Sequence, residues 1–166
     1  MSASPPPPLA IGALLRFALD DVRERIYRGV VDAGFTDVRP VHVTLFRWPG
    51  PDGMRPTELA AAVHISKQSA NDRLGELERL GYLRRDPDPQ DSRARIVRLT
   101  ARGRRLHEAA LAAHDRIERE WEDAVGARRL HVLRETLAAL TPPAPTPTAI
   151  SRSASEAASA PARARR

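Results

Sequence analysis

The fold is decided by residues 57–81, TELAAAVHISKQSANDRLGELERLG, which predict two short helices joined by a tight turn. Thr57 is expected to cap the first helix, because a threonine side chain can accept a hydrogen bond from a free backbone N–H at a helix start. This helix runs to about Val63, and Glu58 in its first turn complements the helix dipole. Two short helices joined in this way form a helix-turn-helix.

The second helix of this pair is expected over Lys67–Leu80, with Ser66 as its N-cap and Gly81 as the residue that ends it. At 100° per residue one narrow stripe of this helix faces the core. This stripe carries Ala70, Leu74, Leu77 and Gly81. The opposite face carries Gln68, Asp72, Gly75 and Arg79, flanked by Ser69 and Asn71.

The polar face of the second helix is chemically suited to reading DNA bases. Gln and Asn side chains pair bidentately with adenine, and an Asp accepts from cytosine N4. The helix N-terminus also offers free N–H groups to phosphates. The alternative is a face that is merely solvated, but Gly75 is unexpected there, because a mid-helix glycine costs ~1 kcal/mol relative to alanine. Arg73 lies nearer the core stripe, which favours bracing a neighbouring helix or reaching a phosphate over reading a base. The candidate DNA-binding residues of this helix are Ser66, Lys67, Gln68, Ser69, Asn71, Asp72 and Arg73.

A β-hairpin is predicted after the helix pair. Two β-prone runs, Tyr82–Arg84 and Ile96–Leu99, are separated by a long charged loop. Three arginines are expected around this turn, namely Arg85, Arg93 and Arg95. The turn also contains Asp86, Asp88 and Asp91.

The arginines of the hairpin tip are further candidates for DNA contact. Aspartate and proline already supply the bend, so the turn needs no arginine for its geometry. An arginine there can enter a narrow minor groove, where the potential is most negative. Asp91 is close enough in sequence to hold Arg93 in a defined rotamer. The alternative is a solvated charged loop with incidental ion pairs.

Long amphipathic helices are expected on both sides of the helix pair. Residues 9–33 carry apolar side chains at a spacing of three to four, and Gly34 ends that helix. A second long helix follows Thr100, and a final helix follows the break at Gly126. Their apolar faces carry Leu15, Leu19, Val22, Ile26 and Val30, then Leu106, Ala110, Ala113 and Ile117, then Leu130, Leu133, Leu137 and Leu140. A short helix over Val41–Arg47 and, at residues 54–56, a stub of strand or a connector complete the expected elements.

The predicted fold is therefore mainly α with a small β-hairpin wing: a winged helix-turn-helix lobe over residues 38–103. It is flanked by long helices at residues 9–33 and 104–140. The Ser/Pro arm at residues 1–8 and the basic, Pro- and Ala-rich tail at residues 141–166 are expected to be disordered.

Composition narrows the possible functions. The net charge is +6, and residues 66–105 hold eleven Lys and Arg against six Asp and Glu, which suits a polyanionic partner. No cysteine is present, so disulfides and thiolate chemistry are excluded. No apolar run approaches the ~18 residues of a membrane span, and the N-terminus does not resemble a signal peptide. We therefore expect a cytoplasmic protein.

The histidines do not predict a metal site. His107 and His114 are seven residues apart, which is ~10 Å of helix rise and too far to share one ion. The other three histidines are His42, His64 and His131, and none has a suitably spaced partner. No phosphate loop, nucleophile elbow or paired-carboxylate motif occurs, so we expect no cofactor and no enzymatic activity.

The ordered motifs of the lobe resemble the MarR family of bacterial transcriptional regulators. The resemblance covers residues 38–106 and rests on the order and spacing of five pieces. These are TELA (57–60), SKQS (66–69), LERLGYLRR (77–85), DPQDSRA (88–94) and LTARG (99–103). One departure is visible: the family usually has two arginines after the wing aspartate, and Ser92 here replaces the first, which leaves Arg93 alone.

The resemblance implies a homodimer held by the long flanking helices, with the second helix of the pair in the major groove and wing arginines in the minor groove. It also implies a small aromatic effector between the lobe and the dimer layer. Candidate lining residues are Phe35, Phe46, Trp48 and Trp121, although single aromatics at such positions are also typical of a core. The function expected is a ligand-responsive repressor that binds a pseudo-palindromic operator in double-stranded DNA. The alternative is a winged helix used for protein–protein contact.

Overall fold

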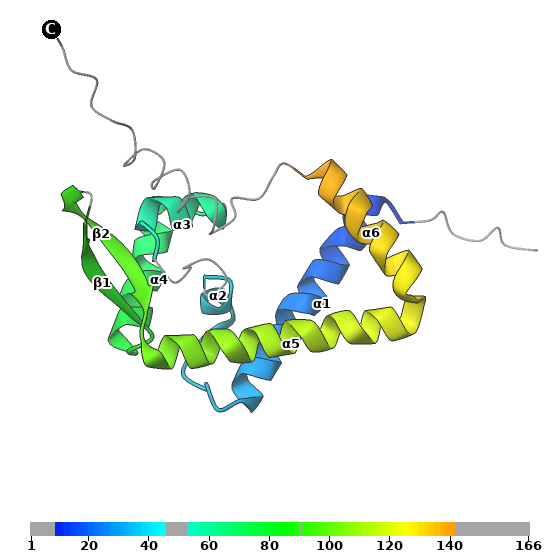
Figure 1. Ribbon diagram of the computed structural model, residues 1–166, viewed down its shortest axis with the longest axis horizontal. Coiled ribbons are helices and arrows are strands. Elements are labelled where there is room, and N and C mark those ends of the chain that lie inside the picture. The colour runs from blue at the N-terminus through cyan, green and yellow to red at the C-terminus, as the bar shows by residue number, and fades with distance from the viewer. Residues whose placement is uncertain (1–8, 46–52, 90, 142–166) are drawn as a thin grey trace, which may run out of the picture.

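The computed structural model describes residues 9–45, 53–89 and 91–141. In chain order its elements are α1 (Ile11–Asp32), α2 (Pro40–Val43), α3 (Pro56–Ala62), α4 (Lys67–Arg79), β1 (Leu83–Asp88), β2 (Asp91–Leu99), α5 (Ala101–Val125) and α6 (Ala127–Leu140). Helices α2, α3 and α4 gather with the hairpin at one end of the long helix α5, and α6 turns back at its other end (Figure 1). The expected fold class, mainly helical with a small β-hairpin, is confirmed.

The group formed by α2, α3, α4 and the hairpin, hereafter the lobe, shares one apolar core with the ends of α1 and α5 nearest to it. Its fully buried side chains include Val30, Leu45, Leu59, Leu74, Leu77, Tyr82, Val97 and Leu106. The predicted stripe of α4 is confirmed at Ala70, Leu74 and Leu77, all at most 1% exposed. Gly81 is exposed instead, because it lies beyond the helix end at a φ of +75°.

Helix starts agree with the sequence at α4 and α5 and differ at α3. The Oγ of Ser66 accepts from Ser69 N at 3.1 Å, and Oγ1 of Thr100 accepts from Gly103 N at 3.1 Å. The expectation that Thr57 caps α3 is wrong: the cap residue is Arg55, whose N–H donates to Glu58 Oε2 at 3.1 Å. Pro56 occupies the first helical position, where its missing N–H costs nothing, and the helix therefore starts two residues earlier than expected.

The hairpin is longer than predicted. The residues interpreted as a long charged loop belong mostly to β1 and β2, which pair from Leu83↔Leu99 to Asp88↔Asp91 with an irregularity after Pro87. Aspartate and proline are poor strand formers, but a two-stranded ribbon has free edges that tolerate them. Met54 pairs with the outer edge of β2: its backbone exchanges two hydrogen bonds with Val97, at 3.1 and 2.8 Å.

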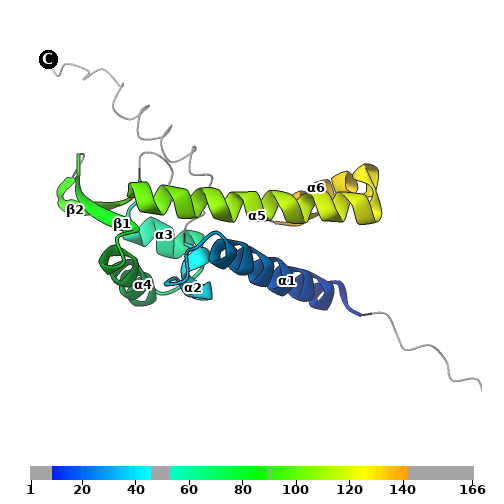
Figure 2. The same cartoon turned by 90° about the horizontal axis from the view of Figure 1, so that it is seen from below.

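The long helices α1 and α5 lie side by side along part of their length, as both views show (Figures 1 and 2). Their crossing is close: a Cβ built on Gly29 would lie 2.7 Å from the Cβ of Ala113. On α5 the predicted apolar face is confirmed, with Leu106, Ala113 and Ile117 buried. Gly126, at a φ of +85°, ends α5 as expected.

Much of the apolar surface of the long helices is uncovered. Helix α6 buries none of its residues, and α1 buries only Val30. Large apolar side chains that are 42–71% exposed here include Ile11, Leu14, Leu15, Phe17, Leu19, Leu111, Val125, Val132, Leu133 and Leu140. Within the described ranges, no helix has both the length and the apolar character to cross a membrane.

Three sequence predictions fall partly or wholly outside the described residues. The N-terminal arm at residues 1–8 and the tail beyond residue 141 are not described. The short helix predicted over Val41–Arg47 is seen as α2, which begins one residue earlier, at Pro40, and ends at Val43.

Candidate nucleic-acid interface

Helix α4 presents its polar residues to solvent. Its first turn is fixed by the Ser66 cap and by burial of Ala70 against the core. The side chains predicted to read bases therefore project from a rigid start. Lys67, Gln68, Asn71 and Asp72 are exposed, and Ser69 is half-buried.

Arg73 lies on the inner side of α4, as its position near the core stripe indicated. It is half-buried, and its charge reaches the buried ring of His42 on α2, where it is one of the influences that lower the pKa. Gly75 has open space around it: a Cβ built there meets nothing within 4 Å.

A histidine–glutamate pair joins α2 to the middle of α4. His42 is 1% exposed, and its Nε2 lies 2.7 Å from Oε2 of Glu76. The backbone N–H of Arg39 donates to His42 Nδ1 at 3.2 Å, so the neutral ring carries its proton on Nε2 and donates to Glu76. Arg39 also forms an ion pair with Glu76.

The environment of this pair favours neutral histidine and ionised glutamate. Burial lowers the pKa of His42 most, and the hydrogen bond to Glu76 opposes this. The hydrogen bonds from His42 and Arg39 hold the pKa of Glu76 below its ordinary value. The hydrogen bond between His42 and Glu76 therefore holds α4 against α2, and the buried histidine ring carries no charge.

The C-terminus of α4 is capped by the first turn of α5. Oγ1 of Thr100 donates toward the carbonyls of Gly81 and Tyr82, at 2.7 and 3.1 Å, and Arg102 donates to the Leu80 carbonyl at 2.6 Å. These bonds satisfy carbonyls that a helix end leaves without partners.

The partly exposed Arg102 guanidinium also contacts the buried ring of Tyr82 and the carboxylate of Asp37. It lies 4.3 Å from the ring centre of Tyr82 and 2.9 Å from Asp37, while the Tyr82 hydroxyl donates to Asp37 at 2.5 Å. Burial, with the bond to Asp37, raises the pKa of Tyr82 to about 12. Although burial raises the pKa of Asp37, the bond from Tyr82 and the charge of Arg102 outweigh it and the net shift is downward. The loop before α2, the end of α4 and the start of α5 are thus joined at one point.

The structure separates the three hairpin arginines. Arg93 and Arg95 are exposed on β2 near the tip. Arg85 is not at the tip: it pairs with Val97 in the middle of the hairpin. Its Nε lies 3.3 Å from Glu78 and its Nη2 3.5 Å from the Asn71 carbonyl, both on α4. Arg85 therefore braces the hairpin against α4.

Asp91 contacts the backbone at the tip. Its Oδ1 accepts from the Arg93 N–H at 3.0 Å, so the contact seen shapes the turn, whereas the predicted contact was with the Arg93 side chain. A stronger contact at the tip was missed from the sequence: Asp88 is 5% exposed and accepts from Arg55 Nε at 2.7 Å and Nη2 at 2.6 Å. The proline after Arg55 marks a helix start, but nothing in the sequence pairs these two residues.

The structure does not bring together the two described aromatic residues of the predicted effector pocket, Phe35 and Trp121. Phe35 packs against Tyr82 in the lobe core, with ring centres 6.1 Å apart. Trp121 lies near the far end of α5, and the 18 residues between Gly103 and Trp121 span about 27 Å of helix. Phe46 and Trp48 lie outside the described residues.

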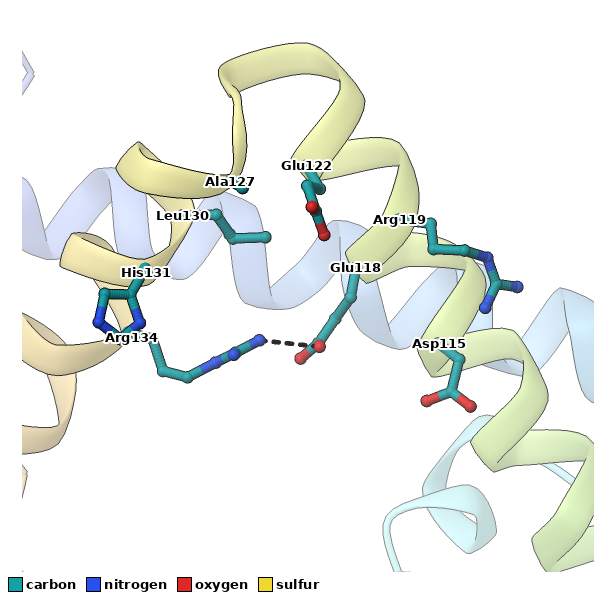
Figure 3. Close-up of a pocket in the computed structure, with 8 residues that line it drawn as sticks. All are labelled: Asp115, Glu118, Arg119, Glu122, Ala127, Leu130, His131 and Arg134. Atoms are coloured by element: carbon teal, nitrogen blue, oxygen red, sulfur yellow. Dashed lines mark hydrogen bonds and ion pairs between the residues drawn. The ribbon is translucent and has the colours of Figure 1, made fainter.

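Two small pockets occur in the part of the chain that is described, and neither contains these aromatics. One, of about 290 Å³, lies in the angle between α5 and α6 (Figure 3), where Arg134 donates to Glu118 at 2.9 Å. Its lining is Asp115, Glu118, Arg119, Glu122, Ala127, Leu130, His131 and Arg134. The other, of about 190 Å³, adjoins the His42–Glu76 pair. Among the described residues no group of three His, Asp or Glu is placed to hold a metal ion.

An exposed polar helix start, a capped and braced helix, and a β-hairpin with exposed arginines define a winged helix-turn-helix protein. Comparison with known proteins shows which family this chain resembles. A sequence model of the MarR family matches residues 49–94. The transcriptional regulator HosA of Escherichia coli O111:H- is 33% identical over 69 residues, which are 42% of this chain and 51% of HosA. This chain therefore covers about half the length of that curated relative.

Solved structures cover more of the chain. The transcriptional repressor CouR, bound to a 23-mer DNA duplex, is 26% identical with a TM-score of 0.63, over 79% of this chain and 92% of CouR. CouR from Rhodococcus jostii RHA1, bound to p-coumaroyl-CoA, is 24% identical with a TM-score of 0.66, over 80% and 92% of the two chains. The chain is therefore similar to MarR family proteins in sequence over residues 49–94 and in fold over most of its length.

Proposed function

We propose that this protein is a cytoplasmic, homodimeric, ligand-responsive repressor that binds a pseudo-palindromic operator in double-stranded DNA. The observation that carries the proposal is the exposed polar start of α4, held rigidly beside a hairpin with exposed arginines. Helix α4 enters the major groove, and the hairpin tip reaches the adjacent minor groove.

Base readout falls to Gln68, Asn71 and Asp72, the exposed residues of the first turns of α4 that can accept or donate to base edges. Ser66, Lys67 and Ser69 contact phosphates near the helix N-terminus. On the hairpin, Arg93 and Arg95 are the arginines free to approach DNA, whereas Arg73 and Arg85 act mainly by bracing α4.

The dimer is proposed from the uncovered apolar surface of α1 and α6. Large side chains such as Phe17 on α1 and Leu133 on α6 are roughly half exposed, which a folded monomer rarely sustains over a contiguous area. A second copy would cover both helices and place two α4 helices in successive major grooves about 10 base pairs apart.

Response to a ligand is the third part of the proposal. CouR, which has the same fold, is solved both with DNA and with p-coumaroyl-CoA. In this chain an effector would act by shifting the dimer between spacings that fit and do not fit the operator.

The test uses a duplex that the full-length protein selects from a random library. Gln68→Ala and Asn71→Ala should weaken binding to the selected duplex much more than to a scrambled duplex. Arg93→Ala should lower affinity for both. Equal losses on the two duplexes for the α4 variants would contradict base readout.

The alternative is a winged helix used for protein–protein contact, and the salt dependence of DNA affinity distinguishes the two functions. Each phosphate contact contributes about one unit to the slope of log affinity against log salt, so DNA binding should fall steeply between low and physiological salt. A variant lacking residues 141–166 should keep sequence-specific binding, and its loss would assign binding to the tail.

A further inference from the structure

Arg55 is not among the proposed DNA-contact residues, but it contacts the hairpin tip. It is the cap residue of α3, 38% of its side chain is exposed, and it donates to Asp88 at the hairpin tip through both Nε and Nη2. Asp88 is itself 97% buried in its side chain, so its carboxylate depends on partners inside the protein.

The residues before α3 attach it to the hairpin at two separate points. The Met54 backbone pairs with Val97 in the middle of β2, opposite Arg85. The Arg55 side chain holds Asp88, three residues further along β1 and therefore about 10 Å nearer the tip. The brace from Arg85 to α4 also lies in the middle of the hairpin, level with Val97, so the Arg55–Asp88 contact is the attachment nearer the tip and resists rotation there.

The charges around Arg55 strengthen the second attachment. The bond to Asp88, and then the charges of Glu58 and Asp91, raise the pKa of the Arg55 guanidinium above its ordinary value. Arg55 is thus the cation at a point where carboxylates of α3, β1 and β2 converge. Without it, Asp88 and Asp91 at the tip would repel each other.

We propose that Arg55 is a positioning residue for DNA binding: its clamp on Asp88 fixes the direction of the hairpin tip, and so of Arg93, relative to α4. The inference rests on the proposed function, because it assumes that Arg93 contacts DNA. Arg55 itself makes no contact with DNA in this arrangement.

The clamp is tested first without DNA, by hydrogen exchange of residues 83–99 in the full-length protein. Arg55→Ala should speed exchange at the hairpin tip about tenfold while the amides of α5 stay protected. Arg55→Lys should restore part of the protection, because it keeps the charge and one donor. Arg84→Ala is the matched control: it removes an exposed hairpin arginine that pairs with Asp86 at 3.1 Å, and it should leave tip exchange unchanged. Unchanged exchange in Arg55→Ala, or equal acceleration in the control, would overturn the clamp.

The second arm is a double-mutant cycle on the selected duplex. Arg55→Ala alone should weaken binding about tenfold, similar to the loss of a wing arginine. In the Arg93→Ala background, Arg55→Ala should cost almost nothing more, because the contact it positions is already gone. Additive losses would overturn the inference and assign Arg55 a DNA contact of its own. If Arg93→Ala binds as the parent does, the proposed wing contact fails and the inference with it, even where hydrogen exchange has shown the clamp.

Discussion

Two glycines, one in α4 and one in α5, should respond oppositely to the same substitution. Gly103 lies in the first turn of α5, and a Cβ there would stand 2.0 Å from the Tyr82 carbonyl oxygen. Gly75 lies in the middle of α4, and a Cβ there would meet nothing within 4 Å. Gly103→Ala and Gly75→Ala therefore add one methyl group to a closed and to an open site.

The magnitude follows from the contacts of the Tyr82 carbonyl. Real Cβ atoms essentially never approach closer than 3.0 Å, so Gly103→Ala must separate the two backbones by at least 1.0 Å. The Tyr82 carbonyl accepts from Thr100 N at 3.0 Å and from Thr100 Oγ1 at 3.1 Å, and both hydrogen bonds would be lost at that displacement. Two bonds at 0.5–1.5 kcal/mol each give a loss of about 1–3 kcal/mol in the free energy of unfolding. Gly75→Ala should gain about 0.5–1 kcal/mol from helix propensity.

The assay is thermal unfolding followed by circular dichroism at one fixed protein concentration, since association would otherwise shift the midpoint. For a chain of this size the two variants should differ in Tm by about 5–15 °C, with the parent between them. Two variants of equal Tm, or a more stable Gly103→Ala protein, would refute the reasoning.

The same Gly75→Ala variant also reports on DNA binding. If the space beside Gly75 is where a DNA backbone or base comes close, the more stable protein should bind the selected duplex more weakly. Unchanged binding would show that this face of α4 stands clear of DNA.

Three further predictions concern the contacts that hold α4 and the long helices. The pKa of His42 is lowered in the folded state, so as the pH falls below about 6.5 the unfolded chain takes up the proton first, and the free energy of unfolding should fall as the pH falls toward the folded pKa. In urea midpoints measured across this pH range, His42→Gln should flatten the dependence on pH. Parallel curves for the variant and the parent would count against this prediction. Arg102→Ala removes the hydrogen bond to the Leu80 carbonyl and the ion pair with Asp37, and it should lower the free energy of unfolding in urea by about 1–3 kcal/mol. Arg102→Lys should not restore this stability, because lysine lacks the planar guanidinium with its several donors. Full rescue by lysine would contradict the prediction. Gly29→Ala should lower Tm, because the added methyl group would lie 2.7 Å from the Cβ of Ala113. Adding Ala113→Gly to the same chain should recover most of that loss. A double variant no more stable than Gly29→Ala would show that the close crossing is not the cause.

Features that depend on local chemistry could be predicted from the sequence. The limits of α4 follow from a serine that caps its start and a glycine that ends it, and its buried face follows from the spacing of Ala70, Leu74 and Leu77. The apolar face of α5 follows from the same periodicity. These signals lie within one turn of the residues they determine, so no knowledge of the rest of the chain was needed.

Features that depend on a distant partner could not be predicted. Asp88 was expected in a solvated turn, but Arg55, 33 residues away in sequence, makes its burial possible. His42 likewise depends on Glu76. Arg85 was expected at the hairpin tip because Asp and Pro indicate a loop, whereas strand pairing extends past them and brings Arg85 against α4.

The aromatic residues show the limit of grouping residues by type. Phe35 and Trp121 suit the same kind of ligand, but Phe35 packs on Tyr82 in the lobe core and Trp121 lies near the far end of α5. Composition alone carries no information about that separation.

Helix α6 has a consequence for how the protein behaves when it is scarce. It has 14 residues and buries none of them within its own chain, and isolated helices of that length are only marginally stable in water. If the proposed dimer covers this helix, a newly made chain should carry a loosely formed C-terminal helix until it meets a second copy, and proteases should cut the chain there first. The level of expression would then set the lifetime of each molecule as well as the number of molecules.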